Sequence, residues 1–141
     1  MNKIKNTLFS NKPVTINNDS IIMALESSCD ETACAIVKGG REVLANVVAS
    51  QIKIHEAYGG VIPEIAAREH LEAVNVVIEE AFKQALLYAP DKIEAKYNLA
   101  LLYENNNKDK AKELYIEILE QDPTFEEAKN ALNDMSVTDF Y

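Results

Sequence analysis

Cysteine, histidine and long apolar runs are scarce in this sequence, and each scarcity excludes a class of protein. The only cysteines, Cys29 and Cys34, lie five residues apart with no second pair, which does not make a zinc site. We expect reduced thiols and no metal centre. No apolar run approaches the roughly 20 residues that span a bilayer, and the first twenty residues hold no block suited to a signal peptide. The sequence therefore predicts a cytoplasmic protein that does not enter the membrane.

Positive charge is also in short supply. The formal net charge is −9, from 14 basic and 23 acidic residues. Neither half of the chain carries a basic stripe, and nucleic-acid binding draws most of its affinity from phosphate neutralisation. We therefore expect no direct, tight binding to nucleic acid. The composition, 48% hydrophobic and 26% charged, is that of a globular protein and not of a disordered one.

The longest periodic stretch, residues 63–86, predicts one amphipathic helix. Pro63 suits a first helical position, and Pro90 closes the far end. The larger apolar residues recur at steps of three and four, which places them on one stripe. They are Ile65, Leu71, Val74, Val77, Ile78, Phe82, Ala85 and Leu86.

Strand patterns precede this helix and helix patterns follow it. Residues 1–20 read as a polar, mobile leader. Apolar runs at 21–26, 32–37 and 41–50, separated by a polar SSCDE turn and a Gly39-Gly40 turn, predict a three-stranded antiparallel meander. Downstream, the segments 91–107, 108–123 and 125–135 predict two helices and a partial third. The fold class is therefore α+β: a β-meander, a long helix, then an all-α helical hairpin.

The downstream helices have the spacing of a helical repeat. Pro90 and Pro123 lie 33 residues apart, close to the 34-residue period of tetratricopeptide repeats, and residues 78–133 resemble about one and a half such repeats. An ordinary helical hairpin is the alternative. The repeat interpretation divides the chain into units 21–88 and 89–141 that share helix 74–88. It makes Leu99, Tyr103 and Tyr115 candidate interaction residues, with a peptide as a possible partner at the repeat face.

The string LESSCDETA, residues 25–33, is a strand that ends in a hydroxyl-rich, acidic turn. Such a turn can offer hydroxyls and backbone N–H groups to a phosphate, while Asp30 or Glu31 could hold the accompanying magnesium. The same residue types are favoured in any hairpin turn. Both interpretations stay open on the residues alone.

The string ESSCDETA, followed by REVLANVVASQIKIHEAYGGVIPEIAAREHLEAV, resembles the start of the universal tRNA adenosine threonylcarbamoyltransferase family. This family, formerly classed as glycoproteases, is part of the actin-like ATPase superfamily. The resemblance runs from about residue 22 to residue 85 and implies the first meander and helix of an actin-like lobe. It places Ser27, Ser28, Asp30 and Glu31 in the first nucleotide-side turn. In that family the enzyme transfers a threonylcarbamoyl group from its adenylate to an adenosine of tRNA.

The sequence departs from that family in its metal ligands and its second lobe. The family's metal site uses an H-x-x-x-H helix and a downstream aspartate, whereas the only histidines here are His55 and His70. We expect His55 to be a packed or solvated loop residue, and His70 to lie on an exposed polar helix face. With no second lobe there is no interdomain cleft. We therefore assign no catalytic residue and expect no cofactor beyond weak Mg-ATP binding.

The sequence supports two hypotheses about function. A third is that the chain is a rearrangement product without a selected role. The first is a non-catalytic protein–protein interaction module, in which a transferase fragment is fused to a short helical repeat. The second is a participant in tRNA threonylcarbamoyladenosine biosynthesis that keeps residual nucleotide binding. Partners would be subunits of the tRNA threonylcarbamoylation complex, and the open sheet edge would also permit self-association. The C-terminal helices should pack beside the long helix.

Overall fold

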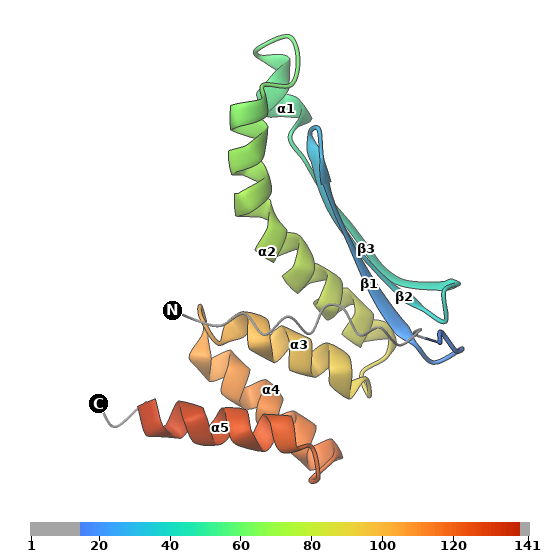
Figure 1. Cartoon of the computed structure of the whole chain (residues 1–141), viewed down its shortest axis with the longest axis vertical. Helices are drawn as coiled ribbons and strands as arrows, with labels where there is room; N and C mark the ends of the chain where they lie inside the picture. Colours follow the sequence, from blue (N-terminus) through green and yellow to red (C-terminus); the bar gives the residue numbers. More distant parts are fainter. Residues whose placement is uncertain (1–14, 139–141) are drawn as a thin grey trace.

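The computed structural model describes residues 15–138, which form a three-stranded antiparallel sheet followed by helices (Figure 1). Most of the predicted leader, residues 1–14, lies outside the described residues. The mixed α+β class is confirmed. In chain order the elements are β1 (Ile21–Ser28), β2 (Glu31–Lys38), β3 (Glu42–Ser50), α1 (Ile52–Glu56), α2 (Pro63–Tyr88), α3 (Ile93–Tyr103), α4 (Lys108–Gln121) and α5 (Glu126–Thr138).

The sheet is a simple meander in the order β1-β2-β3. Ser28 pairs with Glu31, so the first turn contains only two residues, and the serines of the SSCDE motif belong to β1. The second connection is longer than the predicted Gly39-Gly40 turn, because Lys38 pairs with Glu42. Within the strands, a register shift between Ile36 and Val37 leaves Leu44 of β3 without a directly opposite residue in β2. A β-bulge of this kind bends and twists a strand pair locally.

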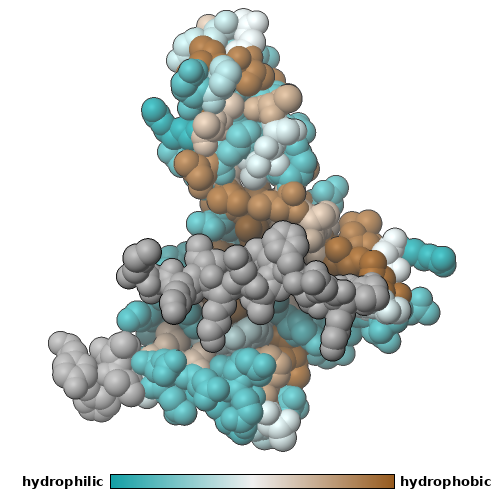
Figure 2. Space-filling view, viewed as in Figure 1, coloured by the Kyte–Doolittle hydropathy of each residue, from teal (hydrophilic) through white to brown (hydrophobic). Residues whose placement is uncertain are grey.

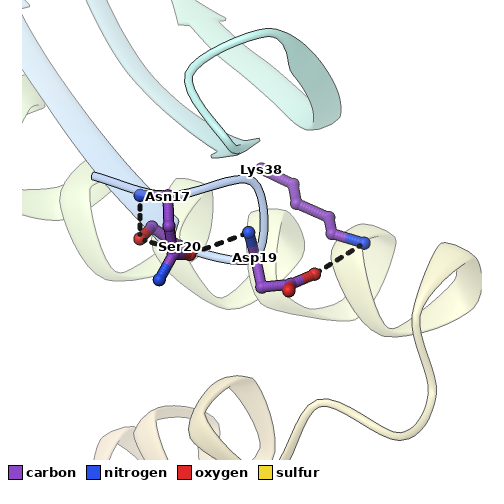
Figure 3. A network of polar contacts seen from close by, with 4 residues as sticks. All are labelled: Asn17, Asp19, Ser20 and Lys38. Atoms are coloured by element: carbon purple, nitrogen blue, oxygen red, sulfur yellow. Dashed lines mark hydrogen bonds and ion pairs between the residues drawn. The ribbon is translucent and has the colours of Figure 1, made fainter. Parts of the chain in front are cut away.

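A turn at Asn17–Ser20 fixes where β1 begins (Figure 3). The Asn17 side chain accepts the backbone N–H of Asp19 at 2.9 Å, and the Asp19 carboxylate lies 3.7 Å from the Lys38 ammonium at the end of β2. Gly39 adopts a φ of +57°, and a Cβ there would lie 2.9 Å from the Asn18 carbonyl oxygen. Glycine is therefore required for this turn to lie against the β2–β3 connection.

Helix α2 lies along one face of the sheet, chiefly over β2 and β3. The prediction that its buried stripe consists of large residues is only partly right, because Leu71 is 76% exposed. The stripe that meets the sheet is built mainly from alanines, and small side chains let the helix backbone approach closely. Its buried members are Ala66, Val77, Ala81, Phe82 and Ala85. Facing them are the buried strand residues Cys34, Ile36, Leu44 and Ala45.

The C-terminal helices pack one on the next from the last turns of α2, whose first turns extend away from them (Figure 1). Helix α3 contacts α2, α4 contacts α3, and α5 contacts α4. An aromatic cluster joins these helices: the ring centroid of Tyr97 lies 5.9 Å from that of Tyr115 and 5.3 Å from that of Phe125. The predicted partial third helix is α5, which runs for 13 residues. Among the described residues, no helix is both long and apolar enough to cross a membrane.

Candidate functional site

The four residues predicted to bind nucleotide lie together at one end of the β1–β2 hairpin. Ser27 and Ser28 end β1, Asp30 is in the turn, and Glu31 begins β2. All are exposed except Asp30, which is partly buried. The Ser28 hydroxyl donates to the Glu26 carboxylate. The Ser27 and Glu31 side chains and the Asp30 carboxylate are thus presented at the surface.

The turn has two special backbone features. Cys29 adopts a φ of +51°, a left-handed conformation that costs an L-residue other than glycine roughly 1–2 kcal/mol. The Asp30 carbonyl accepts the backbone N–H of Gln51 at 2.7 Å, which ties the turn to the end of β3. The turn is therefore held in a fixed shape by the neighbouring strand end. Cys29 itself is exposed, whereas burial raises the pKa of the Cys34 thiol.

A shallow cavity of about 340 Å³ lies beside the turn. It is open to solvent, and its lining includes two carboxylates, a histidine and two glycines. Carboxylate oxygens are the ligands that magnesium prefers, and a phosphate would need such a cation here to offset the negative charge. The lining residues are Asp30, Ile52, His55, Glu56, Gly59, Gly60 and Val61. Within residues 15–138, no group of three or more histidines, cysteines and carboxylates is arranged to hold a metal ion.

A buried polar network behind this cavity begins at His55. This residue is 3% exposed and lies in the short helix α1, not in a loop as predicted. The Ile62 N–H donates to His55 Nδ1 at 3.3 Å, so the proton of the neutral ring is on Nε2, which donates to Gln51 Oε1 at 2.9 Å. Each ring nitrogen and the buried amide oxygen therefore have a partner, as buried polar groups require.

The network continues to His70, which the sequence interpretation placed on an exposed helix face. His70 is instead partly buried, because α2 turns this side chain toward the sheet. Its Nδ1 lies 2.7 Å from Thr32 Oγ1 and 3.3 Å from Gln51 Nε2. Since the Gln51 amide nitrogen can only donate, Nδ1 is an acceptor and the Thr32 hydroxyl donates to it. The network joins β2, the end of β3, α1 and α2, and it holds the turn in place.

The three predicted interaction residues are all buried. Leu99 and Tyr103 are 4% and 5% exposed and line a groove of about 270 Å³ between α2, α3 and α4. Tyr115 is fully buried and contributes packing, not contact surface. These residues are buried because the inward-facing positions of a helical hairpin are covered by the neighbouring helix. Lys83, Lys110, Glu113, Leu114 and Glu117 complete the groove.

Two charged side chains of this groove have ionic partners: Lys83 with Glu79, and Glu117 with Lys96 at 3.1 Å. The Lys83 ammonium lies 2.6 Å from the Glu79 carboxylate, and the Tyr103 hydroxyl donates to the same carboxylate at 2.7 Å. Chiefly through the Lys83 contact, the pKa of Glu79 is lowered and that of Lys83 is raised. The Lys110 ammonium lies 5.2 Å from the Tyr103 ring centroid, a cation–π distance. The groove therefore presents a half-apolar surface with both signs of charge.

The other unusual surface is the free edge of β1. Among residues 15–138, β1 has a strand partner on one side only, and its α2-side residues Met23 and Leu25 are 45% and 46% exposed. An apolar cavity of about 240 Å³ opens beside it, lined by Ile21, Met23, Ile36, Phe82, Glu94, Ala95 and Asn98. Figure 2 shows hydrophobic surface gathered around the sheet and α2, whereas the visible face of α5 is hydrophilic.

Known proteins are similar to part of this chain. Residues 42–95, which run from β3 into α3, match the model of the family described as tRNA N6-adenosine threonylcarbamoyltransferase. A Clostridium perfringens protein of that name is 60% identical over 68 residues, covering 48% of this chain and 20% of the relative. Relatives of the same name from Geotalea daltonii and Geobacillus kaustophilus are 60% and 59% identical, over 46% and 50% of this chain.

The chain spans about a fifth of the length of these relatives. The identity within that fifth is high, and the model match includes the α1 segment, the Gly59-Gly60 pair and α2. Residues 96–138, which contain most of α3 and all of α4 and α5, fall outside the matched range. Across residues 42–95, this chain is thus similar to the tRNA N6-adenosine threonylcarbamoyltransferase family.

Proposed function

We propose that this chain is a non-catalytic protein–protein interaction module of the cytoplasm, built from a fragment of a tRNA threonylcarbamoyltransferase and a tetratricopeptide-like repeat. The observation that carries the proposal is the free edge of β1. An edge strand presents a row of unpaired N–H and C=O groups, which is a template for a strand from another chain. The apolar side chains of Met23 and Leu25 lie along this edge, half exposed.

The helical half supports the same function. The C-terminal part of α2 and helices α3 to α5 form successive contacts, each helix packing on the one before it, which fits a short helical repeat. The groove floored by Leu99 and Tyr103 offers a second surface, suited to a peptide that carries both charged and apolar side chains. Subunits that act in tRNA threonylcarbamoylation are the partners that the sequence similarity favours.

Two measurements test this function. The purified chain, supplied with tRNA, threonylcarbamoyl-adenylate and magnesium, should transfer no threonylcarbamoyl group; measurable transfer would refute a non-catalytic role. The tagged chain should also recover subunits of the tRNA threonylcarbamoylation complex from its native cytoplasm. That recovery should fall in a Leu25→Lys variant, which places a charge on the edge, and persist in Leu71→Lys, whose side chain is already 76% exposed. Equal recovery by both variants would remove the edge from the function.

A second candidate is a participant in tRNA threonylcarbamoyladenosine biosynthesis that binds nucleotide weakly at the β1–β2 turn. The observation that favours it is the open cavity beside Asp30, with Glu56 on the same wall. We expect calorimetry to detect weak ATP binding that requires magnesium and is lost in Asp30→Ala. The matched control is Asp19→Ala, which removes an exposed carboxylate far from that cavity. ATP binding that is equal in both variants, or undetectable in the parent, would rule out this candidate.

A further inference from the structure

We infer that the occupant of the free β1 edge is β1 of a second copy of this chain, paired antiparallel to form a continuous six-stranded sheet. The inference rests on the proposed protein-binding role of that edge: a second copy occupies the edge, and the pathway subunits bind the resulting dimer, which Leu25→Lys would dissociate. A two-fold axis would relate the two copies. The interface would be isologous, because each copy contributes the same strand.

The backbone of β1 offers alternate residues to this partner. The Gly39 N–H donates to the Ser20 carbonyl at 2.8 Å, so the hydrogen-bonded pairs of β1 with β2 occur at even-numbered β1 residues. Bonding alternates along antiparallel strands. The N–H and C=O groups of the odd-numbered residues therefore point to the free edge. They belong to Ile21, Met23, Leu25 and Ser27.

One register makes this strand complementary to itself. When the two-fold axis passes between the Ala24 residues of the two copies, Ala24 lies opposite its own equivalent. Met23 of each copy then pairs with Leu25 of the other. Met23 and Leu25 pair with Ile36 and Cys34 of β2, which are buried under α2, so both side chains lie on the α2 side of the sheet. The half-exposed methionine and leucine of one copy would therefore pack against the leucine and methionine of the other. Apolar cross-strand pairs of this kind stabilise sheets.

The charges are compatible with the same register. Glu26 is the only charged residue of β1, and rotation about Ala24 sets it opposite Ile22 of the second copy, not opposite another carboxylate. The acidic turn at Asp30 would approach the start of the other β1. That end carries both signs of charge: Lys38, which lies 3.7 Å from Asp19, and Lys92, which shares its wall with Asp19 and Glu94. The lysines of this end are thus balanced by carboxylates of the same copy, and the complementarity of the two strands rests on the apolar side chains of Met23 and Leu25.

The edge also lacks the features that prevent strand pairing. Natural edge strands are protected by lysine, proline, bulges or short length. β1 extends over eight residues with no lysine or proline, and its pairing with β2 shows no register shift. The apolar cavity beside Ile21 and Met23 continues this surface toward α3. A second copy would cover that surface along the full strand.

A cysteine cross-link tests the register directly. In the proposed pair, Ala24 faces its own equivalent at a non-hydrogen-bonded position, where the two Cα atoms lie about 4.5 Å apart, within disulfide range. The exposed native thiol is first removed by Cys29→Ser. In that background we expect Ala24→Cys to form a covalent dimer on mild oxidation. Val48→Cys, at a 51% exposed position on β3, should stay monomeric.

Sedimentation of the full chain gives the second measurement. The parent and the Cys29→Ser background should sediment as dimers, and Leu25→Lys as a monomer with unchanged circular dichroism. A monomeric parent, or equal cross-linking at positions 24 and 48, would overturn the inference. Recovery of pathway subunits that still depends on Leu25 would then assign the edge to a different protein and leave the proposed function standing. A parent that dimerises only after residues 1–14 are deleted would assign the edge to that segment and also overturn the inference.

Discussion

Replacing Phe82 by alanine is expected to lower the free energy of unfolding of the whole chain by about 3–5 kcal/mol, the usual cost of a large-to-small change in a core. Phe82 is 7% exposed and lies where the two halves of the molecule meet. It borders the same apolar cavity as Met23 and Ile36 of the sheet and Ala95 of α3. Removing the ring would therefore withdraw contacts from the sheet and from the helices together.

Hydrogen exchange monitored along the chain would check this expectation. Amides of β2 and of α4 should lose protection by the same amount in Phe82→Ala, because one core cluster includes residues of both halves. Leu87→Ala is the control: this residue is on the same helix but is 82% exposed, and surface substitutions usually change stability by less than about 0.5 kcal/mol. Loss of protection confined to β2 or to α4 would show that the two halves fold independently.

Tyr115→Ala should have a comparable effect, about 3–5 kcal/mol, because this is the largest fully buried side chain of the described residues. Its ring packs near Tyr97, and its hydroxyl donates to the Glu104 carboxylate at 2.7 Å. Tyr115→Phe keeps the ring and removes only the hydroxyl. A hydrogen bond to a charged group contributes about 1.5–3 kcal/mol, so the phenylalanine variant should lose roughly half as much. Urea unfolding of the two variants separates packing from hydrogen bonding.

The Tyr115 hydroxyl also gives a pH dependence with a definite sign. Burial, followed by the hydrogen bond to Glu104, raises the pKa of Tyr115 far above its ordinary value. A group whose pKa is higher in the folded state stabilises fully below its unfolded pKa, about 10 for tyrosine, and loses that contribution as pH rises further. The parent should therefore lose stability progressively above about pH 10. Tyr115→Phe should lose less over the same range.

Part of the loss of stability at alkaline pH will remain in Tyr115→Phe. Burial also raises the pKa of Tyr97 and Tyr103, so the slope should decrease and not vanish. Ile116→Ala, at the neighbouring but 49% exposed position, should leave both the stability and its pH dependence close to those of the parent. An alkaline slope that is identical in the parent and Tyr115→Phe would show that the hydroxyl is ionisable at its ordinary pKa.

The sequence anticipated the candidate turn better than its surroundings. Ser27, Ser28, Asp30 and Glu31 are neighbours in sequence, so a two-residue hairpin brings them together wherever the strands lie. The contact between Thr32 and His70 joins residues 38 positions apart. No local pattern marks it, because a histidine between charged residues on a helix reads as exposed until the sheet is placed beside it. The five-residue helix α1 was missed for a related reason: it is too short to show a helical period.

The sequence by itself determined the order and type of the longer elements. Alternation, turn residues and the 3.6-residue period are local properties, and they predicted three strands, a long helix and helices after it. The period also placed Val77, Phe82 and Ala85 on the buried face of α2, but tertiary structure decided which other residues of that helix are covered. Leu71 is exposed and Ala66 is buried because α2 approaches the sheet through its small residues. It also decided that Met23 and Leu25 remain half exposed, because their exposure depends on where α2 ends its coverage of the sheet.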